Sequence, residues 1–108
     1  MEYFNEYEGR LFMECMSLAD SAPSGREIIK ETLNIMKMLL EKNVSYGDSA
    51  LNPINVFSKV NTEDQIDIRL DDKLSRIKRG SEYKNEDTIN DIIGYLILKK
   101  ICRNMPRV

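Results

Sequence analysis

The sequence contains no histidine, and its two cysteines, Cys15 and Cys102, lie far apart. Without an imidazole, the chain has no histidine base, no Ser-His catalytic triad and no histidine metal ligand. Because the cysteines form no C-x-x-C pair, the pattern argues against a zinc site. We expect both cysteines to be reduced thiols that pack as small apolar side chains.

Long apolar runs are also missing. A helix that spans a bilayer needs about 20 predominantly apolar residues, and no stretch of this sequence approaches that length. The segment MEYFNEYEGR at the start is acidic and lacks the apolar core of a secretory signal. These absences predict a cytoplasmic protein that does not associate with a membrane.

The charge balance argues against a further class of function. The 108 residues include 16 basic and 18 acidic side chains, a formal net charge of −2. A dedicated DNA-binding surface normally shows a large basic excess, so we do not expect one here. The length fits a single helical domain over residues 1–108. Because so short a chain leaves much of its surface exposed, an oligomer interface would stabilise it.

Apolar residues recur every three or four positions in four segments, which is the period of an amphipathic helix. We predict helices over residues 2–19, from Ser24 to about Asn43, from Thr62 to Gly80, and from Asn85 to the tail that begins at Arg103. The pairs Ser24 with Glu27 and Thr62 with Gln65 have the spacing of a capping box at a helix start. The expected buried face of the last helix consists of Ile89, Ile92, Ile93, Leu96, Ile97 and Ile101.

Residues 44–61 lose the helical period and contain turn-forming residues, among them Gly47 and Pro53. So long a connection in a small protein often has a functional role. The pattern as a whole predicts an all-α fold, a small antiparallel four-helix bundle with a long loop between the second and third helices.

The segment Tyr46-Gly47-Asp48-Ser49 is the most distinctive part of this loop. Gly47 allows a tight turn, and Tyr46 offers an aromatic face that can stack on a base. Asp48 and Ser49 add an acceptor and a hydroxyl. A loop that only ends a helix explains the same residues without a ligand.

A row of cations lies on the third predicted helix. Arg69, Lys73 and Arg76 are spaced so that all three share one face. One guanidinium group can donate to two phosphate oxygens at once, so this row suits a phosphate-bearing ligand. Asp72 can pair with Arg69 or Arg76, and a solvated face with such ion pairs is the alternative.

Two acidic pairs have the same i, i+4 spacing, Glu27 with Glu31 and Asp87 with Asp91. If they faced each other across the bundle, they could hold Mg²⁺ together with substrate phosphates. Helix capping and solvent exposure explain most of these carboxylates equally well.

Asp91 differs from the other acids because it lies at the edge of an apolar face, where an unpaired carboxylate is costly. We therefore expect it to pair with Arg69, Lys73 or Arg76.

Several of these residues form spaced blocks along residues 26–101. The blocks are Lys42-Asn43, Tyr46-Gly47-Asp48-Ser49, Arg69, Asp72-Lys73, Arg76, Glu86-Asp87-Thr88, Asp91 and Tyr95. In this order they resemble the nucleotide modification associated domain one family, small proteins common in phages and bacterial mobile elements. Residues 1–24 fall outside the resemblance and add an N-terminal helix. The sequence departs from the family in its polar, Asn-rich insert between Ser49 and Arg69, and in Gly94, where the family often has Asn.

The resemblance also extends, more distantly, to the all-helical MazG-type nucleotide pyrophosphohydrolases. Those enzymes hold their metal with E-x-x-E and E-x-x-D motifs. The acids here are spaced E-x-x-x-E and D-x-x-x-D, so the catalytic pattern does not match in detail.

Residues and resemblance together indicate a polar pocket for a nucleotide. Its expected members are Tyr46, Gly47, Asp48, Ser49, Arg69, Lys73, Arg76, Asp91 and Tyr95. The favoured function is a small binding protein without cofactor or catalytic residue, a phage-type sponge that sequesters a phosphate-bearing or cyclic nucleotide immune signal in the host cytoplasm.

A different function stays open, a Mg²⁺-dependent nucleotide pyrophosphohydrolase or an accessory protein of nucleotide modification. It would hold the metal with Glu27, Glu31, Asp87 and Asp91. A helical module that binds only another protein is a third possibility.

The first predicted helix carries apolar residues on more than one face: Tyr3, Phe4, Tyr7, Phe12, Met13 and Met16. A core of this size has no room for all of them, and exposed apolar patches usually mark an interface. We therefore predict a homo-oligomer built from two-fold dimers.

Overall fold

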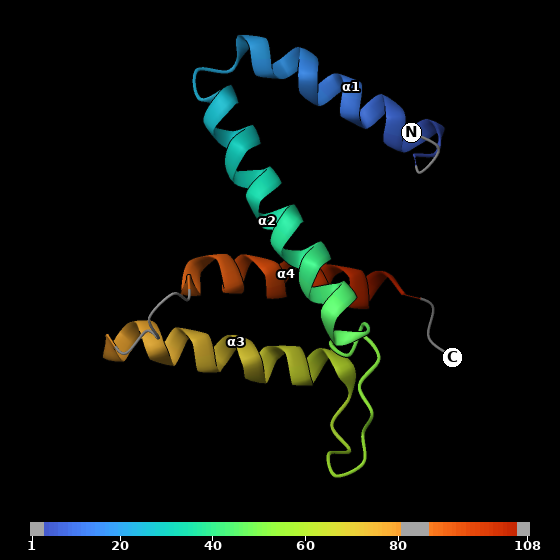
Figure 1. Ribbon diagram of the computed structural model, residues 1–108, viewed down its shortest axis with the longest axis vertical. Coiled ribbons are helices and arrows are strands. Elements are labelled where there is room, and N and C mark those ends of the chain that lie inside the picture. The colour runs from blue at the N-terminus through green and yellow to red at the C-terminus, as the bar shows by residue number, and fades with distance from the viewer. Residues whose placement is uncertain (1–3, 81–86, 106–108) are drawn as a thin grey trace. The chain divides into compact units, whose positions relative to one another are not determined.

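The computed structural model describes residues 4–80 and 87–105, which form four helices and no strand. The helices are α1 (Glu6–Ser21), α2 (Gly25–Tyr46), α3 (Thr62–Arg79) and α4 (Thr88–Asn104) (Figure 1). The prediction of an all-α fold with a long loop between the second and third helices is confirmed. None of these helices is long and apolar enough to cross a membrane.

The chain divides into two compact units, Met1–Met36 and Lys37–Val108, and α2 contributes to both. The assignment of residues 1–108 to a single domain stays a prediction.

The first unit contains α1 and the first turns of α2. Asn5 caps α1 in a full capping box, since its side chain accepts from Glu8 N at 2.8 Å and Glu8 Oε1 accepts from Asn5 N at 3.2 Å. A Cβ atom at Gly25 would overlap the carbonyl oxygen of Ala19. The turn between the two helices therefore needs a glycine where α2 begins.

This unit buries very little. No residue of α1 is buried, and Ile35 is the only buried hydrophobic side chain among the described residues of the unit. Cys15 is exposed rather than packed as a small apolar side chain, which corrects the sequence prediction, while both cysteines are free thiols as expected. The exposed apolar residues of α1 are Tyr7, Leu11, Phe12, Met13, Met16 and Leu18.

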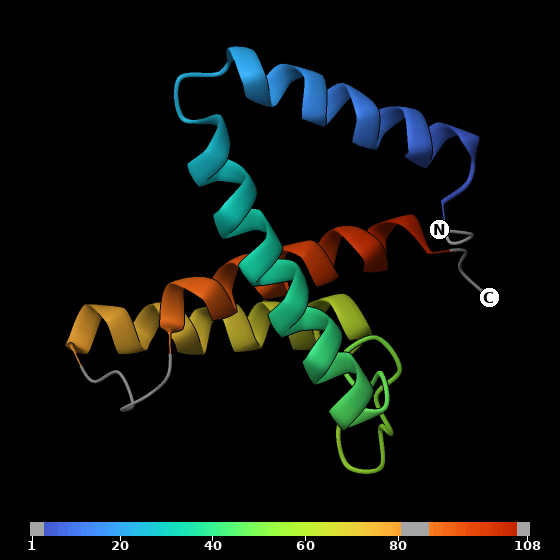
Figure 2. The same ribbon diagram turned by 45° about the horizontal axis from the view of Figure 1, so that its top comes forward.

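The second unit is built on α3 and α4, which lie side by side and run in opposite directions (Figures 1 and 2). Ile66 and Leu70 of α3 are its buried hydrophobic residues among those described. The last turns of α2 reach α4, where the Leu39 side chain lies against the backbone at Gly94. The antiparallel order expected of the bundle is thus seen for α3 and α4, and for the other helices it stays a prediction.

Ion pairs join α3 to α4 along one side. Lys99 Nζ lies 2.7 Å from Asp67 Oδ1, and Arg103 Nε lies 2.6 Å from Glu63 Oε1. All four side chains are at least partly exposed, so these contacts fix the alignment of the two helices more than they stabilise the unit.

Helix ends follow the expected chemistry with small shifts in position. Gly80 ends α3 in the left-handed conformation, with φ 64°, as predicted. Asn61 rather than Thr62 caps α3, because its side chain already reaches Asp64 N at 2.8 Å. Asp87 caps α4 by accepting from Asn90 N at 3.0 Å, whereas the predicted cap Asn85 lies outside the described residues.

The predicted buried face of α4 is wrong for the isolated chain. Thr88, Asp91 and Gly94 are the buried residues of α4. Asp91 contacts Lys42 of α2 and Lys73 of α3, and Gly94 lies against Leu39 of α2. The expected core residues are instead exposed, apart from the half-buried Ile92: Ile89, Ile93, Leu96, Ile97 and Ile101.

Candidate functional site

The end of α2 turns sharply at Gly47 and Asp48, whose φ angles are 59° and 64°. The Asp48 carboxylate holds this turn, since Oδ1 accepts from Asn43 Nδ2 at 2.8 Å and Oδ2 from Asn52 Nδ2 at 2.6 Å. The helix continues to Tyr46, three residues beyond its predicted end. Tyr46 therefore extends from the last helical turn, and 67% of it is exposed.

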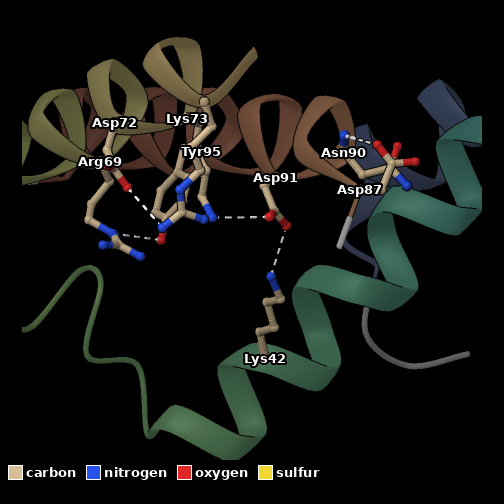
Figure 3. A network of polar contacts seen from close by, with 9 residues as sticks. Lys42, Arg69, Asp72, Lys73, Asp87, Asn90, Asp91 and Tyr95 are labelled. Atoms are coloured by element: carbon tan, nitrogen blue, oxygen red, sulfur yellow. Dashed lines mark hydrogen bonds and ion pairs between the residues drawn. The ribbon is translucent and has the colours of Figure 1, made fainter. Parts of the chain in front are cut away.

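The carboxylate of Asp91, on α4, lies between two lysines (Figure 3). Asp91 Oδ1 accepts a hydrogen bond from Lys42 Nζ at 3.0 Å, and Asp91 Oδ2 forms an ion pair with Lys73 Nζ at 3.2 Å. The Asp91 and Lys73 side chains are only 5% and 4% exposed, whereas Lys42 is 48% exposed. The expectation that Asp91 meets a cation is confirmed, with Lys73 as a predicted partner and Lys42 as an additional one.

The two lysines determine the charge state of the acid. Burial by itself would raise the pKa of Asp91, but the interactions with Lys42 and Lys73 together outweigh burial and hold its pKa below the ordinary value. Asp91 is therefore ionised at neutral pH. With both lysines protonated, the three side chains carry a formal charge of +1.

Arg69 and Tyr95 form a second contact beside this group. Arg69 Nε donates to the Tyr95 hydroxyl at 3.3 Å, and the guanidinium carbon lies 5.9 Å from the centre of the Tyr95 ring. The third predicted cation, Arg76, forms an ion pair with Asp72 at 3.3 Å, one turn earlier on α3. Asp72 thus takes Arg76, one of the two partners that the sequence allowed.

One cavity of about 430 Å³ within the second unit is lined by most of the side chains described above. Seven of the nine predicted site residues are among its lining: Tyr46, Asp48, Ser49, Arg69, Lys73, Asp91 and Tyr95. Gly47 and Arg76 are not. The structure therefore brings together the loop, α3 and α4 as the sequence predicts, and only Arg69 and Lys73 of the cation row reach the cavity.

The cavity also has walls that the sequence does not predict. Lys42 supplies a third cation, while Met38, Leu39 and Leu98 supply apolar surface. Gly94 lies in the wall as well, where the side chains of Leu39 and Met38 pack so closely that a Cβ atom would lie 3.0 and 3.1 Å from them. The cavity thus combines three cations and two tyrosine rings with an apolar side, which suits a ligand that is anionic at one end and aromatic at the other.

Two of the four carboxylates proposed for Mg²⁺ have other roles in the described structure. Asp91 is held by two lysines, which a metal ion would have to displace, and Asp87 caps α4. Glu27 and Glu31 belong to the first unit. Among the described residues, no group of three or more acids or cysteines has the geometry of a metal site.

Comparisons of the chain with family models, with curated proteins and with solved structures return no match. The cavity is therefore the feature of the molecule that indicates a function, and the family resemblance rests on the sequence blocks alone.

Proposed function

We propose that the second unit binds a phosphate-bearing nucleotide in this cavity and holds it without hydrolysing it. The observation that carries the proposal is the convergence of polar residues from the end of α2, α3 and α4 on one cavity. Its volume of about 430 Å³ lies within the range of small-molecule sites.

The placement of charge and aromatic surface suggests how the ligand lies. Arg69 is exposed and offers a planar guanidinium, which suits phosphate oxygens. Tyr46 presents an exposed ring at the rim, where a base can stack. The phosphates thus lie toward Arg69 of α3 and the base toward the exposed ring of Tyr46.

Sequestration rather than turnover is the proposed role. The described residues include no cluster of metal-binding side chains, and Asp91 is committed to lysines. The family resemblance supports a phage-type sponge that removes a cyclic or other phosphate-bearing nucleotide signal of host immunity in the cytoplasm. The alternative is a Mg²⁺-dependent pyrophosphohydrolase, and the following experiment detects it as hydrolysis of the ligand.

Calorimetry with mononucleotides, dinucleotides and cyclic oligonucleotides, with and without Mg²⁺, tests this proposal. We expect Arg69→Ala to weaken binding by about 2 kcal/mol, near the lower end for truncated charge pairs because Arg69 is exposed. Lys78→Ala is the matched control, since Lys78 lies in the last turn of the same helix and does not line the cavity. Arg76→Ala should also have a small effect.

Chromatography of the ligand after denaturation of the complex separates the two functions. Intact ligand supports sequestration, and hydrolysed ligand supports the enzyme. An equal loss of affinity in the Arg69 and Lys78 variants would show that the cavity is not the binding site.

We also propose that the protein is a homo-oligomer built from two-fold dimers. No residue of α1 is buried, and α4 exposes five large aliphatic side chains, so the described chain leaves much apolar surface uncovered. Light scattering at micromolar concentration should return at least twice the chain mass of 12.6 kDa. Leu11→Lys, on exposed α1, should shift the mass toward the monomer, and a wild-type mass near that of one chain would contradict the proposal.

A further inference from the structure

Lys42 and Lys73 share one carboxylate, but only one of them is accessible. The Lys73 side chain is 4% exposed, whereas the Lys42 side chain is 48% exposed. Both line the cavity. The two lysines therefore have different access to a ligand although they bind the same acid.

We propose that Lys42 binds the phosphate of the ligand together with Arg69 of α3. This inference rests on the proposed nucleotide-binding function and adds a residue on α2 to the anionic end of the site. A lysine ammonium has three N–H donors, and Lys42 directs one of them to Asp91 Oδ1 at 3.0 Å. Among the described residues Lys42 has no second partner, so its other donors are available to the cavity.

The contact with Asp91 fixes the position of Lys42, so that ligand binding loses little side-chain entropy. Asp91 holds the ammonium at the cavity wall, so the flexible side chain is already ordered before a ligand arrives (Figure 3). Asp91 keeps its buried ion pair with Lys73 at 3.2 Å, whatever Lys42 contacts. Because Lys73 is buried, Lys42 is the lysine of this group whose charge is accessible to a ligand.

The charge of the described lining also suits a phosphate. Lys42, Arg69 and Lys73 outnumber Asp48 and Asp91 among the charged residues of the lining. Asp48 already accepts two hydrogen bonds from asparagine side chains. An anionic group between Lys42 and the α3 face balances the charge of the cavity.

Lys42→Gln tests the inference, because glutamine keeps a donor toward Asp91 but removes the charge. The probes are ATP, adenosine and inorganic pyrophosphate. We expect Lys42→Gln to weaken ATP and pyrophosphate binding by about tenfold or more and to leave adenosine binding unchanged, since adenosine has no phosphate. Lys42→Arg should retain most of the affinity for ATP and pyrophosphate.

Lys37→Gln is the control, since Lys37 lies on the same helix, pairs with Glu41 and is exposed outside the cavity. It should change none of the three affinities. Thermal melting of each variant checks folding, which the remaining Asp91–Lys73 pair preserves in Lys42→Gln.

The outcomes separate this inference from the proposed function. If Lys42→Gln binds ATP and pyrophosphate as tightly as the wild type, Lys42 is not the phosphate ligand, although the protein still binds nucleotides. If pyrophosphate binds through Lys42 but no nucleotide binds, the phosphate site stands and the nucleotide function is wrong. If the wild type binds neither ATP, pyrophosphate nor any member of the nucleotide panel, both are wrong.

Discussion

Lys73→Met is expected to lower the free energy of unfolding by about 3 kcal/mol, because it leaves the buried carboxylate of Asp91 with a single, half-exposed partner. Methionine keeps most of the volume and the apolar stem of lysine, so the loss reports the charge and not a cavity. Urea denaturation followed by circular dichroism, at one fixed protein concentration, measures the difference.

Lys99→Met is the matched control. Lys99 also bridges two helices, through its 2.7 Å ion pair with Asp67, but both side chains are partly exposed. Such pairs contribute at most about 1 kcal/mol. Equal losses in the two variants would show that burial of the Asp91–Lys73 pair does not determine its contribution.

Acid provides an independent check on the same pair. The pKa of Asp91 is lower in the folded chain than in the unfolded chain, so Asp91 stabilises the fold above about pH 4 and this contribution is lost as the pH falls through the folded pKa. The stability difference between the wild type and Lys73→Met should therefore shrink on acidification below about pH 4.

The sequence predicts the helices well where local chemistry decides them. Gly80 ends α3 because glycine adopts the left-handed conformation without a Cβ penalty. This helix end can be predicted because it depends on the identity of one residue alone. The cap of α3 shifts by one residue because Asn61 and Thr62 both suit a cap, and only the backbone position decides between them.

The sequence does not predict which side of α4 is packed. Hydrophobic period places Ile93 and Ile97 on one stripe, and both are exposed in the described chain. The face toward α2 instead carries Asp91 and Gly94. An apolar stripe shows that a surface needs a partner, but it does not show whether the partner belongs to the same chain.

In the candidate site, too, the sequence predicts the local features but not the contacts between helices. Asp91 signals its need for a cation because it lies at the edge of an apolar face, and the i, i+4 spacing of Arg69 and Lys73 places both on one side of α3. Spacing relates only residues of one helix. Lys42 lies 49 positions before Asp91 on a different helix, so only the tertiary structure brings the two together.

Gly94→Leu is expected to abolish ligand binding, with a loss of affinity of at least about 100-fold, because the new side chain fills the wall of the cavity. Even a Cβ atom at this position would lie 3.0 Å from Leu39 Cδ2 and 3.1 Å from Met38 Cε. Both neighbours line the cavity, so a larger side chain displaces them into it or separates α2 from α4. We expect a stability loss of about 1–3 kcal/mol, as for other overpacked sites.

Gly94→Ala separates the filling of the cavity from a general disturbance of α4. Its Cβ meets only the ends of two flexible side chains, and alanine favours a helix over glycine by up to about 1 kcal/mol. The Ala variant should therefore be close to the wild type in stability and bind ligand within a few-fold. If calorimetry shows that Gly94→Leu still binds the ligand as the wild type does while its α4 remains helical, the cavity beside Gly94 is not where the ligand lies. In that case the side of α4 toward α2 packs the helices together and has no part in binding.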